Sequence, residues 1–254
     1  MSSEILNYPS QRKHTYHFLD HAKEFSPVYL SVDVDVSNLQ KSRDYIYAST
    51  QTKISYIAFI IKGISKVLKK YPQANVSVKE ALSPKMAVYN EIIAKFTLDK
   101  TINKERVVLT GKVFNSDSKP LEEIQHDIEY YKNTEFQEIE DFKPIKMLHS
   151  LPTWLGNILY KMNVGNLKKR HNIQGTFTVT SLGHRPIKHF YPITSATLCF
   201  GIGAIEEKAK VIDSSIEIRP ILPVCLTFDH RAIDGALAAD ILAEIKEQLE
   251  KWGD

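Results

Sequence analysis

The chain has 254 residues, of which 43% are hydrophobic and 25% are charged, and its formal net charge is +3. A chain of this length can bury a core of its own, and this composition is typical of a globular protein rather than a disordered or fibrous one. So small a positive charge excludes an argument for nucleic-acid binding from charge alone.

The two cysteines and the N-terminus indicate a cellular compartment. Cys199 and Cys225 each lie in an apolar, strand-like run, which is typical of small buried residues under reducing conditions rather than of disulfides or a metal site. The first residues contain no apolar signal segment, and no apolar run reaches the length of a membrane span. We therefore expect a cytoplasmic protein without nucleic-acid or membrane partners.

The first half of the chain predicts helices around one clear strand. Residues 11–24 predict a helix, and in the run VYLSVDVDVS that follows, three valines recur with the two-residue period of a half-buried strand. The segment ISYIAFIIKGISKVLKKYP, residues 54–72, predicts a helix with a broad apolar face that ends at Pro72.

The second half predicts most of the sheet. Short strands are expected around 85–98 and 106–114, before a helix that Pro120 leads and that Ser116 or Ser118 would cap. Three apolar strands follow, GTFTVTSL, ATLCFGIG and ILPVCLTF, and then a final amphipathic helix, GALAADILAEIKEQLEKW. Strands and helices are mixed without strict alternation, which predicts an α+β fold with a large mixed sheet and packed helices.

No repeat or low-complexity linker divides the chain, so residues 1–254 predict a single domain. Between Asp141 and Glu206 there is no acidic residue, whereas lysine and arginine accumulate. The apolar part of this segment, MLHSLPTWLGNILYKM, has two interpretations. It is a helical hairpin with a solvated basic face, or an electropositive lid or rim that faces a phosphorylated or acidic partner.

Histidines recur on the first helix. His14, His17 and His21 share one helical face and could hold a metal ion only with a fourth ligand, which the sequence does not supply. A surface or interface face is the interpretation that we favour, and we predict no metal site.

His230 lies at the end of a predicted strand, where a catalytic side chain can be exposed. Known nucleophile and phosphate-loop motifs are absent, but in LTFDHRAIDGALAADIL, residues 226–242, His230 directly follows an apolar strand. A neutral imidazole accepts a proton near pH 7, so His230 is a candidate general base; the alternative is a structural histidine at a strand end. Asp234 could fix the turn or pair with a cation.

The segment FDHRAIDGALAADIL resembles the HxxxDG signature of the dihydrolipoamide acyltransferase catalytic domain of 2-oxoacid dehydrogenase complexes, a family related to chloramphenicol acetyltransferase. GTFTVTSLGHRPIKHFYPI, RKHTYHFLDHAKEFSPVYLSVDVDVSNL and ISYIAFIIKGISKVLKKYPQAN resemble other segments of this family in the right order. The similarity covers most of the chain and is weakest from about 98 to 170. It implies a chloramphenicol acetyltransferase-like two-layer sandwich.

The resemblance also implies a mechanism. His230 would deprotonate a thiol or hydroxyl acceptor, which attacks an acyl thioester. Thr180 matches the hydroxyl that the family holds near the tetrahedral oxyanion, and Ser181 is the weaker candidate because it would point to the other face of the strand.

The same resemblance implies structural support and assembly. Asp234 would pair with Arg12 and hold the histidine loop, and Gly235 would let the chain turn into its last helix. Family members form trimers or shells built from trimers, with the site at the subunit interface, so we expect a homotrimer or a higher multiple of three.

The chain also departs from the family. Lipoyl and peripheral-subunit-binding domains do not precede the similarity, and residues 142–170 resemble an insertion or lid. We therefore expect no tightly bound cofactor, an acyl donor that is coenzyme A or an acyl carrier protein, and a small-molecule hydroxyl or amine as acceptor. Ser181, Lys168, Lys169 and Arg170 are candidate donor-binding residues. The alternatives are a lipoyl carrier supplied in trans and a non-catalytic trimeric scaffold.

Overall fold

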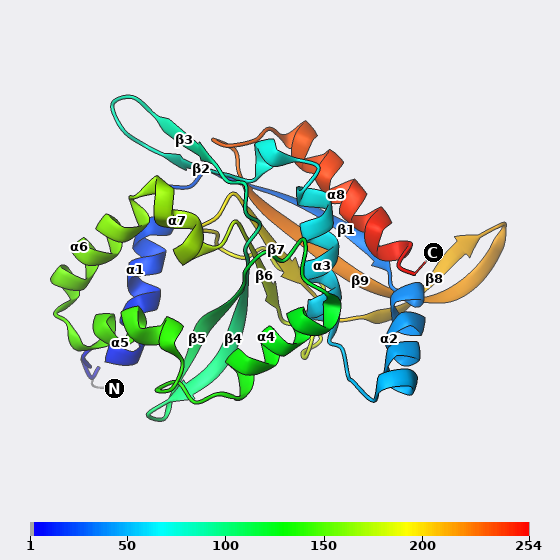
Figure 1. Ribbon diagram of the computed structural model, residues 1–254, viewed down its shortest axis with the longest axis horizontal. Coiled ribbons are helices and arrows are strands. Elements are labelled where there is room, and N and C mark those ends of the chain that lie inside the picture. The colour runs from blue at the N-terminus through cyan, green and yellow to red at the C-terminus, as the bar shows by residue number, and fades with distance from the viewer. Residues whose placement is uncertain (1–2, 254) are drawn as a thin grey trace.

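The computed structural model describes residues 3–253 (Figure 1). The helices are α1 (Lys13–Ala22), α2 (Ser37–Thr50), α3 (Tyr56–Leu68), α4 (Leu121–Asn133), α5 (Lys143–Ser150), α6 (Thr153–Val164), α7 (Leu167–Gln174) and α8 (Gly235–Glu250). The strands are β1 (Pro27–Asp35), β2 (Val76–Lys79), β3 (Lys85–Val88), β4 (Ala94–Ile102), β5 (Glu105–Val113), β6 (Phe177–Ser181), β7 (Leu198–Ile202), β8 (Glu206–Ile212) and β9 (Ser215–Asp229). Of the helices in this range, none is long and apolar enough to cross a membrane.

The main sheet is mixed, which confirms the predicted α+β class. Its strand order is β1-β9-β7-β6-β4-β5, and β8 pairs with the part of β9 that extends beyond β7. Strands β4, β6 and β7 run parallel, whereas the other pairs are antiparallel. The last residue of β9, Asp229, lies opposite the first residue of β1, Pro27. The loop that leads into α8 therefore begins at the end of the sheet where β1 enters.

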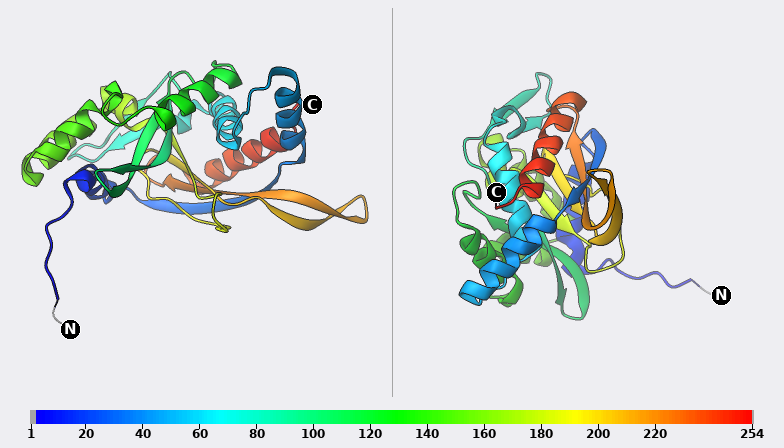
Figure 2. Two further views of the ribbon diagram at one scale, coloured as in Figure 1. Left: turned by 90° about the horizontal axis from the view of Figure 1, so that it is seen from below. Right: turned by 90° about the vertical axis from the view of Figure 1, so that its right-hand side faces the viewer.

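Helices α3, α4 and α8 cover one face of this sheet and give the fold its two layers (Figure 2). Side chains alternate between the faces of a strand, and on the helix-covered face Phe177, Phe200 and Phe228 are fully buried. Gly63 allows helices α3 and α8 to pack closely, since a Cβ atom at this position would lie only 2.8 Å from the side chain of Leu249. Each buried phenyl ring contributes roughly 2–3 kcal/mol, so this face forms the core.

The opposite face of the central strands is polar yet also buried. Thr178, Cys199 and Thr227 lie side by side in register and are shielded from solvent. Cys225 is likewise a buried free thiol, as the sequence predicted for both cysteines. Burial raises the pKa of Cys199 to about 12, so its thiol stays protonated and unreactive near pH 7. Lys95 continues this row on β4, and burial lowers the pKa of its ammonium group to about 8.

A loop, residues 184–197, crosses this polar face against the backbone of β7. A Cβ atom at Gly201 would lie 2.2 Å from the carbonyl oxygen of Phe190, and one at Gly203 would lie 2.0 Å from that of Lys188. Glycine is therefore required at positions 201 and 203 because two backbone segments touch there.

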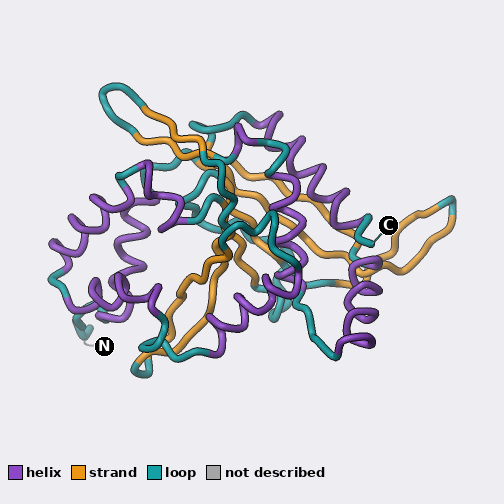
Figure 3. Tube along the Cα trace, in the orientation of Figure 1, coloured by secondary structure: helices purple, strands orange, loops and turns teal. Residues whose placement is uncertain are grey.

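Helices α1, α5, α6 and α7 form a separate group at one side of the molecule, as Figure 3 shows. The acid-free segment contains α5, α6 and α7 and then β6 and β7. Its apolar part, MLHSLPTWLGNILYKM, lies in the successive helices α5 and α6, both of which pack against α1. Gly156 allows α6 to approach α1 closely, since a Cβ atom at this position would lie only 2.7 Å from His17 Nε2.

Two hairpins extend away from the body (Figure 1). The β8–β9 hairpin exposes Val211, Ile216 and Ile218, and the β2–β3 hairpin exposes Leu82 and Met86. Exposed apolar side chains gathered on an arm are typical of a surface that contacts another chain.

Some sequence expectations differ from the structure. The sequence analysis did not predict α2, β2 or β8; in α2 only Leu39 is buried, so the helix carries a weak apolar pattern. Neither Ser116 nor Ser118 caps α4, because the residue before this helix is Pro120 and both hydroxyls bond to backbone carbonyls elsewhere.

Candidate active site

The loop between β9 and α8 carries His230. Its backbone N–H donates to the carbonyl of Ser26 at 2.8 Å, which ties the loop to the segment that enters β1. The imidazole lies beside the buried ring of Phe228, with the ring centroids 5.8 Å apart, and 48% of the His230 side chain is exposed. The ring is therefore supported on one side and open on the other, as a group that accepts a substrate proton requires.

Asp229 and Arg231, to which the sequence analysis assigned no role, brace this loop. The buried carboxylate of Asp229 accepts hydrogen bonds through Oδ1 from the backbone N–H groups of Ser26 and Arg231, each at 3.2 Å. The guanidinium of Arg231 donates to both carboxylate oxygens, at 3.0 Å from Nε and 2.8 Å from the terminal nitrogen. The two residues that flank His230 are thus held by one bidentate pair.

Within a single copy Asp234 and Arg12 do not pair, so their pairing stays a prediction for an assembly of several copies. Arg12 lies 3.5 Å from Glu105 Oε1. The Asp234 side chain is 88% exposed, with Oδ1 3.8 Å from Nδ1 of His230. Gly235 has no positive φ, and no atom lies within 4 Å of the position of a Cβ atom there, so the turn itself does not require glycine. Asp234 and Gly235 face open space beside the imidazole.

Thr180 and Ser181 lie at the end of β6. The hydroxyl of Thr180 accepts a hydrogen bond from Thr97 Oγ1 at 2.7 Å. Since a hydroxyl carries one hydrogen and two lone pairs, Thr180 keeps its own proton for another acceptor. The hydroxyl of Ser181 accepts from the backbone N–H of Gly183 at 3.2 Å, which directs it into the following turn.

His230 and Thr180 lie far apart within one chain. The strand register aligns Thr180 with Gly201 and Gly201 with Cys225. The residues from Cys225 to His230 then span about 16 Å along the strand direction, at about 3.3 Å per residue. The structure therefore does not bring the predicted base and the predicted oxyanion donor together within a single copy.

The predicted donor-binding cluster is divided by the fold. Lys168 and Lys169 are exposed on α7, whereas Arg170 is only 2% exposed. Arg170 donates from Nε to the carbonyl of Val164 at 2.5 Å and from a terminal nitrogen to that of Val78 at 2.7 Å. Arg170 therefore does not belong to the basic outer surface, which corrects its predicted place beside the two lysines.

The α1 histidines form a contact between helices. His14 Nδ1 lies 3.0 Å from Nε2 of His149 on α5, and His17 and His21 are buried. Burial lowers the pKa of His14, His17 and His21, and it lowers that of His149 to about 4. Across residues 3–253, no three histidine, cysteine, aspartate or glutamate side chains are grouped as a metal site would require.

Comparison with known proteins shows which family the chain matches. The family described as 2-oxoacid dehydrogenases acyltransferase (catalytic domain) matches residues 2–135 and 148–254. The unmatched stretch is 136–147. The match therefore includes residues 148–170, which are most of the segment that we expected to be an insertion or lid.

Two curated relatives carry the name dihydrolipoyllysine-residue acetyltransferase component of pyruvate dehydrogenase complex. The protein from Bacillus subtilis (strain 168) is 28% identical over 229 residues, which are 87% of this chain and 44% of the relative. The protein from Rickettsia typhi is 29% identical over 229 residues, 87% of this chain and 48% of the relative. The chain thus spans about half the length of these relatives.

Solved structures support the fold. A probable dihydrolipoamide acetyltransferase from Listeria monocytogenes has a TM-score of 0.72 at 22% identity, covering 100% of this chain and 97% of that one. The cubic core of a pyruvate dehydrogenase multienzyme complex gives 0.73 at 19%, covering 98% and 93%. Chloramphenicol acetyltransferase gives 0.51 at 10%, covering 98% and 100%, and these likenesses confirm the expected chloramphenicol acetyltransferase-like fold. By the match of its sequence, the chain belongs to the family of 2-oxoacid dehydrogenase acyltransferase catalytic domains.

Proposed function

We propose that this protein is an acyltransferase that takes an acyl group from a thioester and transfers it to a thiol, hydroxyl or amine, with His230 as the general base. The observation that carries the proposal is the half-exposed imidazole, which a buried carboxylate–guanidinium pair holds at the end of β9. Family membership supplies the reaction class.

The chemistry needs two groups. The acceptor loses its proton to the imidazole as it attacks the thioester carbon, and the carbonyl oxygen gains negative charge at the same moment. When the tetrahedral intermediate collapses, the C–S bond breaks and the protonated imidazole returns a proton to the departing thiolate. A hydroxyl that donates to the oxyanion contributes about 3 kcal/mol, and Thr180 retains the proton for that role.

We infer that a complete site combines two copies of the chain. The separation of about 16 Å along the strands excludes joint action of His230 and Thr180 from one copy. In a closed ring of identical subunits, one copy supplies the base and its neighbour supplies the oxyanion donor. The open space beside Asp234 and Gly235 supports this arrangement, since another copy or the substrate can approach there. We propose a homotrimer or a multiple of it.

Two acceptors remain in consideration. The names of the curated relatives favour a dihydrolipoyl group on a lysine residue as the acceptor. A small-molecule hydroxyl or amine is the other acceptor that we consider, and for either acceptor we propose acyl-coenzyme A or an acyl carrier protein as the donor. The exposed Lys168 and Lys169 suit either donor, because both present anionic groups.

The first test is an acyl-transfer assay. Acetyl-coenzyme A is incubated with the protein and with dihydrolipoamide, or with a panel of small alcohols and amines, and free thiol and acetylated product are both measured. We expect turnover with one acceptor class and a loss of about a hundredfold or more in His230→Ala. Turnover with no acceptor, or unchanged turnover in His230→Ala, would contradict the proposal.

Mixing two inactive variants tests the shared site. His230→Ala and Thr180→Ala are each expected to lose activity, but subunits exchanged between them restore sites that contain both groups. If equal amounts of the two variants mix at random in a ring, about a quarter of all sites contain both groups. Such a site takes its histidine from a Thr180→Ala subunit and its threonine from a His230→Ala subunit. Activity that stays at the level of the separate variants would contradict a site built from two copies.

A further inference from the structure

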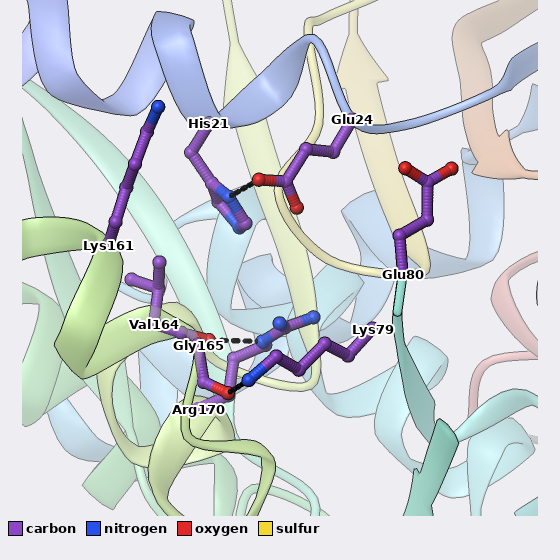
Figure 4. A pocket seen from close by; sticks show the side chains of 8 residues that line it. All are labelled: His21, Glu24, Lys79, Glu80, Lys161, Val164, Gly165 and Arg170. Atoms are coloured by element: carbon purple, nitrogen blue, oxygen red, sulfur yellow. Dashed lines mark hydrogen bonds and ion pairs between the residues drawn. The ribbon is translucent and has the colours of Figure 1, made fainter. Parts of the chain in front are cut away.

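A charged cavity of about 340 Å³ lies between α1, the end of β2 and the turn from α6 to α7. Figure 4 shows the residues that line it, which come from these three segments. The titratable groups that line it are His21, Glu24, Lys79, Glu80, Lys161 and Arg170. Its volume is within the range of cavities that hold small molecules.

Two cations form one wall of this cavity. Arg170 donates two hydrogen bonds to backbone carbonyls, and across residues 3–253 no ion pair joins it to a carboxylate. Lys79 Nζ donates to the carbonyl of Gly165 at 2.8 Å. The carbonyl oxygens of neighbouring residues, Val164 and Gly165, thus position both cations without neutralising them (Figure 4).

The other charged residues already have partners outside the cavity or across it. Lys161 Nζ lies 2.7 Å from Asp20 Oδ2, and Glu80 Oε1 lies 3.5 Å from Arg231. Of the two cations in this wall, Arg170 is buried and Lys79 is exposed. Glu24 lies beside His21 rather than in an ion pair with Arg170. A buried cation without a direct counter-ion is costly, and one anion beside Arg170 would reduce that cost.

The buried side chain of His21 faces the same space. It is only 2% exposed, and neither ring nitrogen makes a hydrogen bond, although Glu24 Oε1 lies 3.4 Å from Nδ1. Figure 4 shows the ring beside the Glu24 carboxylate, with Arg170 across the cavity from both. Burial is the main cause that lowers the pKa of His21, Glu24 opposes it, and Arg170 and Arg231 add to it. An anion beside the ring would favour its protonated form.

We propose that this cavity binds one small anion through a carboxylate or phosphate group, held by Arg170 and Lys79, with His21 as a third donor that takes up a proton on binding. Nothing in this proposal depends on the acceptor of the acyl transfer. The site lies next to the histidine loop, because Arg231 contacts Glu80 of the cavity and also forms the pair with Asp229.

Calorimetric titration of the whole protein with inorganic phosphate and with succinate, at constant ionic strength, tests the proposal. We expect saturable binding of at least one anion at concentrations up to about 10 mM. Binding of phosphate alone, of succinate alone or of both identifies the ligand chemistry and supports the site. Absence of binding of both overturns it.

A matched pair of variants separates the cavity from the general surface charge. Lys79 lines the cavity, and its register partner on the neighbouring strand, Lys85, is exposed and does not line it. Lys79→Gln should weaken binding about tenfold or more, whereas Lys85→Gln should leave it unchanged. Equal affinity in the two variants overturns the assignment, and thermal unfolding of both checks that they fold.

Proton uptake tests His21 in the unaltered protein. Titrations near pH 7 in two buffers of different ionisation enthalpy give the number of protons taken up with the anion. We expect net uptake of a proton fraction that increases as the pH falls toward 6. Binding without any proton uptake would remove His21 from the site.

Discussion

The histidine loop and the neighbouring α1 contact use charge in opposite ways. At the loop, a buried carboxylate and a guanidinium of opposite charge form a bidentate pair. Where α1 meets α5 and α6, four imidazoles are packed in their neutral forms, and two of them lack hydrogen bonds to their ring nitrogens. The same segment of chain, from α1 through Ser26, joins the two regions.

This difference indicates what each region tolerates. A charge pair fails when one member is removed, because the other is left buried and uncompensated. A neutral histidine contact tolerates the loss of one ring better, but it fails in acid because protonation would bury positive charge. The position of the catalytic candidate thus rests on the less pH-sensitive of the two regions.

The largest expected effect comes from Asp229→Ala. Removal of this carboxylate leaves Arg231 with only its longer contact to Glu80 and breaks two backbone hydrogen bonds, so we expect a loss of about 3–5 kcal/mol in the free energy of unfolding. Urea unfolding measures the loss, and activity should fall with it because His230 loses its support.

Asp234→Ala is the matched control. Its side chain is exposed and makes no hydrogen bond in the described chain, so we expect a change below about 0.5 kcal/mol for the unassembled chain. If Asp234→Ala destabilised the unassembled chain as much as Asp229→Ala, the assignment of the brace to Asp229 would be wrong.

Acid should weaken the α1 contact. The pKa values of His14, His17, His21 and His149 are lowered by burial, so folding favours their neutral forms. Their contribution is complete above the unfolded pKa, near 6.5, and is lost as the pH falls through the folded values, down to about 4 for His149. We expect a decrease on the order of 2 kcal/mol between pH 7 and 5.

Hydrogen exchange locates this effect. At about pH 5, protection should fall in α1, α5 and α6 while the amides of β9 stay protected. His149→Gln should reduce the pH dependence, because a neutral amide replaces one imidazole of the His14 pair, whereas His126→Gln on the exposed side of α4 should not. Uniform loss of protection across the sheet would show that acid acts elsewhere.

The sequence predicted the parts of the fold that depend on local patterns. Alternating or continuous apolar runs identified β1, β6, β7 and β9, a broad apolar face identified α3, and an amphipathic pattern identified α8. The strand β8 was missed because its charged residues, such as Lys208 and Lys210, alternate with few apolar ones and its sides are largely exposed. The weakly apolar α2 was missed for a similar reason.

At the candidate site, the sequence did not predict which groups the charged side chains contact. Residue order located His230, but the sequence does not reveal that Arg12 lies near Glu105 or that Arg170 turns toward distant carbonyls. Asp229 was the exception that could have been found. An acidic residue that ends a buried strand, with an arginine two positions later, indicates a local charge pair.

Gly235→Ala is expected to cause no loss of stability, and it sharpens the comparison at the loop itself. Gly235 begins α8, where alanine is the better helix former by up to about 1 kcal/mol, and the added Cβ atom meets nothing within 4 Å in the chain. The unassembled protein should therefore be unchanged or slightly more stable in urea. Activity and assembly should nevertheless decrease, because in the proposed oligomer another copy or the substrate occupies the space beside His230. A variant that is stabilised, assembled and fully active would show that nothing approaches Gly235 closely, and that the site has more room on this side than the proposal requires.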